Sequence, residues 1–177
     1  ILLGETVEMV PAEEPYVVGI DGTQIRRSSL KMPGSSWLKG TRTAPFRPGI
    51  ERGQRFLTGA WLTPLEQGYS RAIPLRFVPA FPPKAVPAEA PPQREWEAGL
   101  TFLKWVRTEL DQAGREEQRI LALADGGFDV LALWRQLPAG VELVVCTARN
   151  RCLYWLPQPR PGPGRPASYG DKAPHPA

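Results

Sequence analysis

The sequence predicts an α/β fold in which helices flank a single mixed sheet. Its segments follow the order strand, strand, strand, helix, strand, helix, strand, and a length of 177 residues suits one domain better than two. The first three strands are close enough in sequence to form an antiparallel meander. The later strands are separated by helices and need crossover connections. We therefore expect a three-strand antiparallel meander extended by parallel strands.

The first strand is predicted over residues 16–25, which read Tyr-Val-Val-Gly-Ile-Asp-Gly-Thr-Gln-Ile. This apolar and β-branched run is typical of a strand that is buried on both faces. Asp21 interrupts it, and a buried charge is costly unless it is paired or binds a metal. The alternative is that Asp21 and Gly22 begin a turn, because Asp-Gly is a common turn pair.

A long basic loop is predicted over residues 26–53, where Gly, Pro, Ser and Arg are abundant. This stretch contains one acid, Glu51, and two isolated aromatic residues, Trp37 and Phe46. Long loops inside compact domains are usually functional or disordered. We interpret this loop as a surface that contacts nucleic-acid phosphates and stacks a ring on an unpaired base. The alternative is a loop that is merely solvated.

Two further strands are predicted over residues 55–63 and 71–80, with a turn at 64–70 between them. Pro74 and Pro79 indicate that the later strand lies at an edge of the sheet, because proline cannot donate a backbone hydrogen bond to a neighbouring strand.

A stiff proline linker over residues 81–94 leads into a predicted helix over 95–113. Glu95 and Glu97 favour the positive N-terminal end of this helix, and Gly114 ends it. Five apolar residues recur at helical spacing along one face. They are Trp96, Leu100, Leu103, Val106 and Leu110.

The pattern of the first strand, an apolar run that leads into an aspartate and a glycine, then recurs. A buried strand over residues 118–124 runs into Asp125, followed by two glycines. A short helix is predicted over 128–137, with Leu131 and Trp134 on its apolar side.

A last strand is predicted over residues 141–147. Arg149 and Arg151 follow it, and we interpret them as residues at the ligand-binding edge of the sheet, with solvent-facing turn residues as the alternative. Residues 152–156 are expected to pair back as a hairpin or to continue the sheet. Residues 157–177 are rich in Pro and Gly, so we expect no regular structure there and interpret them as the start of a missing C-terminal part.

Composition narrows the classes of function. Residues 1–15 are acidic and contain prolines, so we expect the end of an upstream segment or a linker, and a first residue other than Met suggests that residues precede it. A net charge of +4 and a pI near 9.3 permit a polyanionic partner.

Cys146 and Cys152 have no further Cys or His nearby, which argues against a zinc site and for reduced thiols. No apolar run approaches transmembrane length, so we expect no membrane partner.

The two aspartates suggest a chemistry. Asp21 and Asp125 fall on strands that are predicted neighbours at the centre of the sheet, and carboxylate oxygens suit Mg²⁺ or Mn²⁺. Two such ions about 4 Å apart can clamp the attacking and leaving oxygens of a phosphodiester displacement. The nucleophile is then water or a DNA 3′-hydroxyl, which fits a chain whose single histidine, His175, lies in the tail. Asp129 is interpreted as a charge in the first turn of a helix rather than a metal ligand.

Three segments carry a resemblance to a known family. They read Ile-Asp-Gly-Thr at 20–23, Leu-Ala-Asp-Gly-Gly-Phe-Asp at 123–129 and Cys-Thr-Ala-Arg-Asn-Arg-Cys-Leu-Tyr at 146–154. In this order they resemble the DDE transposases of bacterial insertion sequences, which are DDE superfamily endonucleases with an RNase H-like catalytic core. The resemblance covers residues 16–156. It implies that Asp21 and Asp125 are the first and second catalytic, metal-binding aspartates.

The resemblance also implies a reaction and partners. The reaction is Mg²⁺- or Mn²⁺-dependent hydrolysis at transposon ends followed by strand transfer, with double-stranded DNA as transposon end and target. A homodimer in a synaptic complex and a bacterial cytoplasmic location at the nucleoid are implied as well. We assign DNA binding to ten basic residues. They are Arg26, Arg27, Lys31, Lys39, Arg42, Arg47, Arg52, Arg55, Arg149 and Arg151.

One family feature is missing. Members complete the metal site with a glutamate on a helix after the second aspartate, whereas no glutamate here follows Glu142, which lies in a predicted strand. The only later acid, Asp171, sits in a Gly/Pro stretch that cannot hold a ligand on a helix. We therefore predict that this chain is a partial transposase that cannot cleave by itself. The alternatives are a non-catalytic DNA-binding remnant and a host RNase H-like nuclease. A phosphatase of the Asp-x-Asp-Gly-Thr type is excluded because Gly19 replaces its nucleophile.

Overall fold

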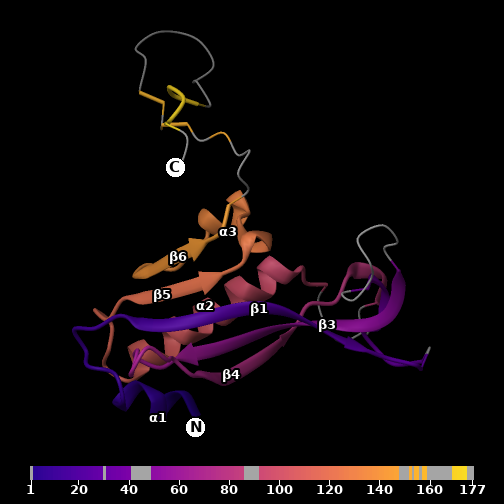
Figure 1. The fold of residues 1–177 in the computed structure, drawn as a ribbon, viewed down its shortest axis with the longest axis horizontal. Helices are drawn as coiled ribbons and strands as arrows, with labels where there is room; N and C mark the ends of the chain where they lie inside the picture. Colours follow the sequence, from indigo (N-terminus) through magenta and orange to yellow (C-terminus); the bar gives the residue numbers. More distant parts are fainter. Residues whose placement is uncertain are drawn as a thin grey trace. The chain divides into compact units, whose positions relative to one another are not determined.

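A computed structural model describes residues 2–29, 31–40, 49–85 and 92–147, and in the C-terminal stretch residues 152, 154, 155, 157, 158 and 169–174. The chain divides into two compact units, Ile1–Cys146 and Thr147–Ala177. The first unit contains all of the sheet and is the larger part of the ribbon in Figure 1.

The first unit is built on a six-stranded mixed sheet. The order is β2-β3-β1-β5-β6, with β4 also paired to β3. The pairs among β1, β2, β3 and β4 are antiparallel, whereas β1–β5 and β5–β6 are parallel. This arrangement confirms the predicted α/β class and its meander of β1, β3 and β4. The strands are β1 (Tyr16–Arg26), β2 (Ser36–Lys39), β3 (Ile50–Leu62), β4 (Ala72–Pro79), β5 (Ile120–Ala124) and β6 (Val141–Val145).

Strand β3 is 13 residues long and joins two parts of the sheet. Its first residues pair with β2, its later residues pair with β4, and β1 runs along its other side. The prediction of a loop throughout 26–53 is therefore wrong, because 36–39 and 50–53 are strands. Neither segment has an apolar run, and long-range pairing decides their conformation. The edge position of β4 is confirmed, since β3 is its only partner among the described strands.

Helix α2 (Glu95–Gln112) covers one face of the sheet and confirms the predicted helix. At its start the Arg94 backbone N–H donates to Glu97 Oε2 at 2.5 Å, and Gly114 follows its end in a left-handed conformation with φ 71°. The other helical segments are short. They are α1 (Leu2–Glu8), α3 (Leu131–Trp134) and the 3₁₀ turns η1 (Pro83–Ala85) and η2 (Gly126–Phe128). None of the described helices is long and apolar enough to cross a membrane.

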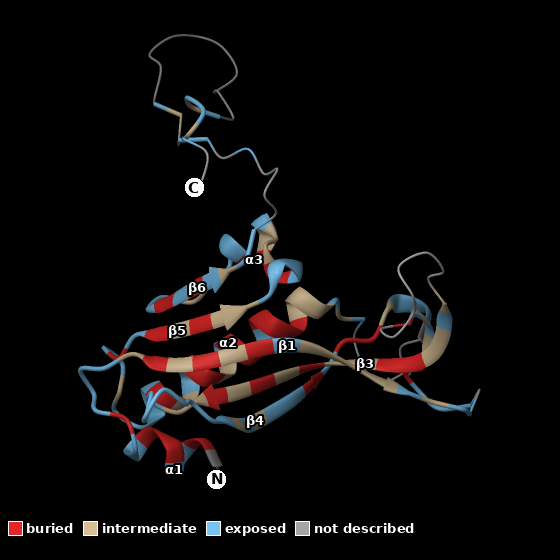
Figure 2. Cartoon of the chain, in the orientation of Figure 1, coloured by how far each residue is buried: buried red, intermediate tan, exposed pale blue. Residues whose placement is uncertain are grey.

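The core lies between α2 and the sheet, where Figure 2 shows the buried residues concentrated. Phe102 is fully buried, and its ring occupies the space that a side chain at Gly59 of β3 would need. Arg107 is buried too, and its guanidinium donates to the carbonyl oxygens of Gln118 and Arg115 at 2.6 Å each. These bonds hold α2 to the turn that precedes β5.

Burial in β1 differs from the prediction. Tyr16, Val18 and Ile20 are buried, the residues between them are only partly buried, and Asp21 is exposed. The strand is thus buried on one face, the face that α2 covers. The opposite face carries exposed apolar residues, with Val144 53% and Phe77 56% exposed.

Two other segments differ from expectation. The linker interpretation of residues 1–15 is wrong, because α1 lies there and Leu3 and Val7 belong to the core. The helix expected over 128–137 reduces to α3, in which Leu133 is buried while Leu131 and Trp134 are exposed. A helix this short cannot turn the whole apolar set inward.

In the second unit the described residues pair with one another. The Trp155 N–H donates to the Asp171 carbonyl at 2.8 Å, and Tyr154 pairs with Lys172 in an isolated bridge. No described residue of 152–158 belongs to the six-stranded sheet, contrary to one of the two expectations for this stretch. Cys146 and Cys152 are both free and exposed.

Candidate active site

The two aspartates follow the last rung of a parallel strand pair. Ile20 of β1 pairs with Ala124 of β5, and Asp21 and Asp125 are the next residues along each strand. Neighbouring strands lie about 4.8 Å apart, so the two backbones are adjacent at this level. The predicted neighbourhood of the two strands at the centre of the sheet is confirmed.

Strand alternation puts both aspartates on the same face. Ile20 points to the α2 side, so Asp21 points away from it. Asp125 has an extended backbone, with φ −77° and ψ 175°, so the alternation continues from Leu123 through it. Both side chains therefore start from the face that α2 leaves open.

Asp21 lies within a continuous strand, so the turn alternative for Asp21 and Gly22 is wrong. It stands opposite Thr58 of β3, and the Thr58 and Thr23 hydroxyls share a hydrogen bond of 2.7 Å on the same face. Among the described residues the Asp21 carboxylate makes no hydrogen bond or ion pair. Its oxygens are available to a ligand.

Asp125 is oriented by the turn that it starts. Its Oδ1 accepts a hydrogen bond from the Gly127 N–H at 2.9 Å, as the N-cap of η2. Gly126 is required at the next position, because a Cβ there would lie 2.8 Å from the Cys146 carbonyl oxygen after β6. This turn holds one carboxylate oxygen and leaves Oδ2 without a bond to any described residue.

The structure brings a third carboxylate to this region, and the sequence did not lead us to assign it to the site. Glu95 is the first residue of α2, and its Oε2 lies 3.3 Å from Arg55 Nη1 of β3. Its Oε1 occupies the space where a side chain at Gly22 would begin. The family pattern directs attention to acids after Asp125, whereas Glu95 precedes it. An acid at the first position of the helix that covers β1 was the available signal.

The electrostatics place Glu95 near both aspartates. Burial raises the pKa of Glu95, Arg55 opposes that shift, and the negative charges of Asp125 and Asp21 raise the pKa further. Each aspartate is therefore close enough for its charge to act on this carboxylate.

The donor chemistry fits Mg²⁺ or Mn²⁺. Asp21 and Asp125 are both exposed and carry carboxylate oxygens that no described residue bonds, which is the ligand type these ions prefer. As the side chains stand, no group of three or more His, Cys, Asp or Glu side chains within the described part of the chain is close enough to hold an ion. Glu95 is engaged with Arg55, which leaves Asp21 and Asp125 as the carboxylates without an ion pair to a described residue in this region.

Comparison with known proteins decides the family. The sequence matches the DDE superfamily endonuclease family over residues 1–177. The chain is a DDE superfamily endonuclease. No curated protein and no solved structure matches it. Enzymes of this family are nucleases that act on DNA, and they typically use a divalent metal.

Six of the ten basic residues assigned to DNA in this endonuclease are described, and four of them bond within the chain. Arg26 Nε lies 2.5 Å from Glu51 Oε2, and Arg27 Nε donates to Gln54 Oε1 at 2.7 Å. Arg52 Nη2 donates to Ser35 Oγ at 2.8 Å, and Arg55 pairs with Glu95 as above. Lys31 and Lys39 are exposed and form no ion pair with a described residue. Arg42, Arg47, Arg149 and Arg151 lie outside the described residues.

Of the two aromatic residues in the basic stretch 26–53, the structure describes only Trp37. Trp37 of β2 is 65% exposed, and it stands opposite Arg52 of β3. Phe46 lies outside the described residues. Trp37 is therefore an exposed ring on the part of the sheet beyond the two aspartates.

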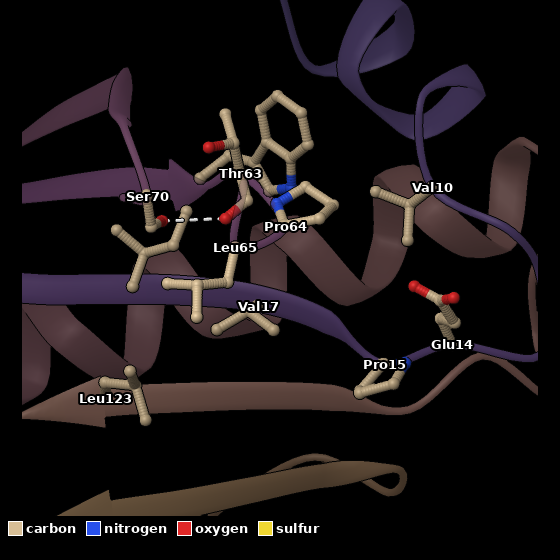
Figure 3. Close-up of a pocket in the computed structure, with 11 residues that line it drawn as sticks. Val10, Glu14, Pro15, Val17, Thr63, Pro64, Leu65, Ser70 and Leu123 are labelled. Carbon is tan, nitrogen blue, oxygen red and sulfur yellow. Dashed lines mark hydrogen bonds between the residues drawn. The ribbon is translucent and has the colours of Figure 1, made fainter. Parts of the chain in front are cut away.

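An apolar hollow of about 310 Å³ lies elsewhere on the sheet (Figure 3). Val17 at the start of β1, Leu123 of β5 and Leu65 beyond β3 line it, and Ser70 Oγ donates to the Thr63 carbonyl at its rim. Neither Asp21 nor Asp125 lines this hollow, so the carboxylate chemistry does not take place there.

Proposed function

We propose that this endonuclease is the catalytic core of a DNA transposase, in which Asp21 and Asp125 hold Mg²⁺ or Mn²⁺. The reaction is hydrolysis of a phosphodiester bond at a transposon end, followed by transfer of the resulting 3′-hydroxyl to target DNA. The proposal is supported by the last paired rung of β1 and β5, Ile20 with Ala124, after which one aspartate follows on each of the two neighbouring parallel strands. Membership of the DDE superfamily endonucleases supports the same residue types at this place.

The residues of the site have separate tasks. A divalent ion, when bound, polarises the phosphoryl group and makes a bound water more acidic. Asp21 and Asp125 hold it, and the Gly127 N–H fixes the direction of the Asp125 carboxylate. Both aspartates are exposed, so a DNA strand can approach them directly.

DNA contact is proposed for the basic arm, which we define as residues 23–55; it includes the last residues of β1, all of β2 and the first residues of β3. Lys31 and Lys39 are its unpaired cations among the described residues, and Trp37 offers a ring for stacking on a base. Arg26, Arg27 and Arg52 hold the arm together through their internal bonds. Arg42, Arg47, Arg149 and Arg151 remain proposed contacts, and a homodimer on paired transposon ends remains a proposal.

Turnover is expected to need the glutamate that this family supplies after the second aspartate. No glutamate follows Glu142 in this sequence, so we expect the 177-residue chain alone to bind DNA without nicking it efficiently. Robust Mg²⁺-dependent nicking of DNA carrying the cognate ends, abolished by Asp21→Ala, would contradict this expectation. The two alternative functions predict different experimental results. A DNA-binding remnant binds DNA with no dependence on metal, and a host nuclease shows no preference for terminal repeats.

The deciding experiment is Mn²⁺ titration by calorimetry of the intact chain and of Asp21→Asn and Asp125→Asn. We expect both variants to lose most of the Mn²⁺ affinity. Asp129→Asn is the matched control, because it removes the same charge near Asp125 while an amide oxygen can still accept from Trp134 Nε1. Equal Mn²⁺ affinity in all four proteins would overturn the metal assignment. Fluorescence anisotropy on terminal repeats against random duplex then separates the transposase from a host nuclease.

A further inference from the structure

We infer that the exposed ring of Trp37 stacks on an unpaired base of the DNA, within about six base pairs of the phosphodiester bond that lies at Asp21 and Asp125. This inference rests on the proposed function and adds to it the kind of base that is contacted and its distance from the cut. The observation that carries it is the register of β3, which pairs with both β1 and β2.

Strand β3 relates the two positions. Asp21 of β1 stands opposite Thr58, and Trp37 of β2 stands opposite Arg52. Thr58 and Arg52 are six residues apart in the sequence, an even number, so their side chains and those of their partners start from the same side of the strand. Six residues of strand extend up to about 20 Å, which is the length of about six base pairs of DNA. One DNA molecule that lies along β3 can therefore contact both positions.

The charge of the basic arm favours DNA on this side. Residues 23–55 contain one acid, Glu51, which precedes Arg52 in β3 and so points to the other side of the strand. There its carboxylate pairs with Arg26. Lys39 is exposed and lies two residues beyond Trp37 on the same side of β2. The side of the arm that carries Trp37 thus presents a cation and no acid of the arm, which suits a phosphate backbone.

The packing of the arm leaves the Trp37 ring outside. Phe81 packs edge-on against Phe56, with 5.5 Å between the ring centroids. A Cβ at Gly34 would lie 2.6 Å from the Phe81 ring, so the loop before β2 rests directly on that ring. The apolar support of the arm is therefore Phe81, whereas Trp37 is 65% exposed. A planar ring that is left in water beside a cation is suited to stacking on a base.

The contact selects an unpaired base. Inside a duplex both faces of each base are already stacked on neighbouring bases, so a protein ring needs a base that has left the stack. The cost of unstacking is lowest for a mismatched or already single-stranded base. Strand β2 is the last strand at its end of the sheet, so its exposed ring can be reached by a base that is turned out of the duplex.

The test is binding of the intact chain to two end-labelled duplexes of one sequence. One is fully paired, and the other has a 2-aminopurine opposite an abasic site at its centre. We expect tighter binding of the second duplex, measured by anisotropy, and quenching of the 2-aminopurine fluorescence by stacking on Trp37. Trp37→Ala should bind the second duplex roughly 5- to 150-fold more weakly, while Trp37→Phe should keep most of the affinity. Trp155→Ala is the matched control, because it removes a ring that is 62% exposed outside the arm.

Iron(II) then measures the spacing and separates the two proposals. Bound Fe²⁺ with hydrogen peroxide cuts DNA near the ion, so the cuts should centre within about six nucleotides of the 2-aminopurine and disappear in Asp21→Asn. Cuts centred farther away overturn the inferred spacing. If the cuts persist in Asp21→Asn, the proposed metal site fails, and the stacking role of Trp37 is decided by the affinities alone.

Equal affinities of Trp37→Ala and Trp155→Ala for the second duplex would overturn the inference, whatever Asp21→Asn does. Circular dichroism checks that each variant is folded. If Trp37→Ala does not fold, Trp37→Leu decides, because leucine keeps an apolar side chain but has no planar ring. Affinity equal to that of the intact chain in Trp37→Leu would then overturn the inference.

Discussion

Strands β1 and β3 each run through two regions that are stabilised in different ways. Under α2, the first half of β1 contributes Tyr16, Val18 and Ile20 to an apolar core. In the basic arm the same strands are joined by polar side chains, with Gln24 Nε2 donating to Glu51 Oε1 at 2.8 Å and Gln54 buried. Asp21 and Gly22 lie where one region passes into the other.

The difference shows why a charged site can sit in the middle of a strand. In the apolar region a carboxylate would lose its hydration, which is costly without a partner. Asp21 points to the face that α2 leaves open, so its carboxylate is exposed while the backbone keeps its pairing with β3. The packed core thus fixes the position of the β1 backbone, and beyond it the polar side chains of the arm are accessible to a metal ion or to DNA.

The largest effect is expected in the core. Phe102→Ala removes a fully buried ring between α2 and Gly59, which should cost about 3–5 kcal/mol in free energy of unfolding. Denaturant unfolding measures the loss. Lys104→Ala, at an exposed position of the same helix, is the control and should change stability little. A small effect of Phe102→Ala would mean that the apolar region is not the frame we describe.

A smaller and local effect is expected in the arm. Gln54 Nε2 donates to the Pro33 carbonyl at 2.6 Å, and Gln54 Oε1 accepts from Arg27 Nε. Gln54→Ala leaves these groups unpaired and should cost about 1–3 kcal/mol. Hydrogen exchange should show faster opening of β2 and the first residues of β3, with protection of β5 retained. Equal loss of protection in both regions would show that the arm and the core unfold as one.

A third effect concerns DNA and changes affinity rather than stability. Replacing Lys31 and Lys39 together with Ala should reduce the slope of log affinity against log salt by about one for each phosphate that the arm no longer neutralises. Arg71→Ala, an exposed cation at the start of the β4 hairpin, tests whether removal of any positive charge has this effect. Anisotropy titrations across a salt series measure the slopes. An unchanged slope in the double variant would mean that Lys31 and Lys39 contact no phosphate and that the arm is merely solvated.

The smallest effect at neutral pH belongs to Tyr16. Its hydroxyl and Thr6 Oγ1 share a buried hydrogen bond of 2.6 Å, and burial raises the pKa of Tyr16 from 10.0 to about 12. The folded state therefore holds the phenol proton more tightly than the unfolded state, so stability should fall as pH rises from 10 towards 12. Tyr16→Phe should lose stability at pH 7 but lack this alkaline decrease. Denaturant unfolding at pH 8, 10 and 11 compares the two, and parallel curves would contradict the assignment.

The sequence by itself determined the elements whose signal is local. The apolar run of β1, the helical spacing in α2 and the run into Asp125 reflect burial along the chain, and the prolines of β4 reflect a missing backbone donor; a sequence records both directly. These elements were enough to place Asp21 and Asp125 on neighbouring strands.

Only the tertiary structure decided the features that depend on distant partners. Strand β2 forms because β3 extends beside it, and α1 is a helix whose Leu3 and Val7 find a place in the core. Asp21 is exposed because α2 covers just one face of β1. Glu95 reaches Gly22 because Arg55 of β3 stands beside the first residue of α2. Each of these outcomes depends on contacts between residues far apart in the sequence. Such contacts leave no local pattern from which they could be predicted.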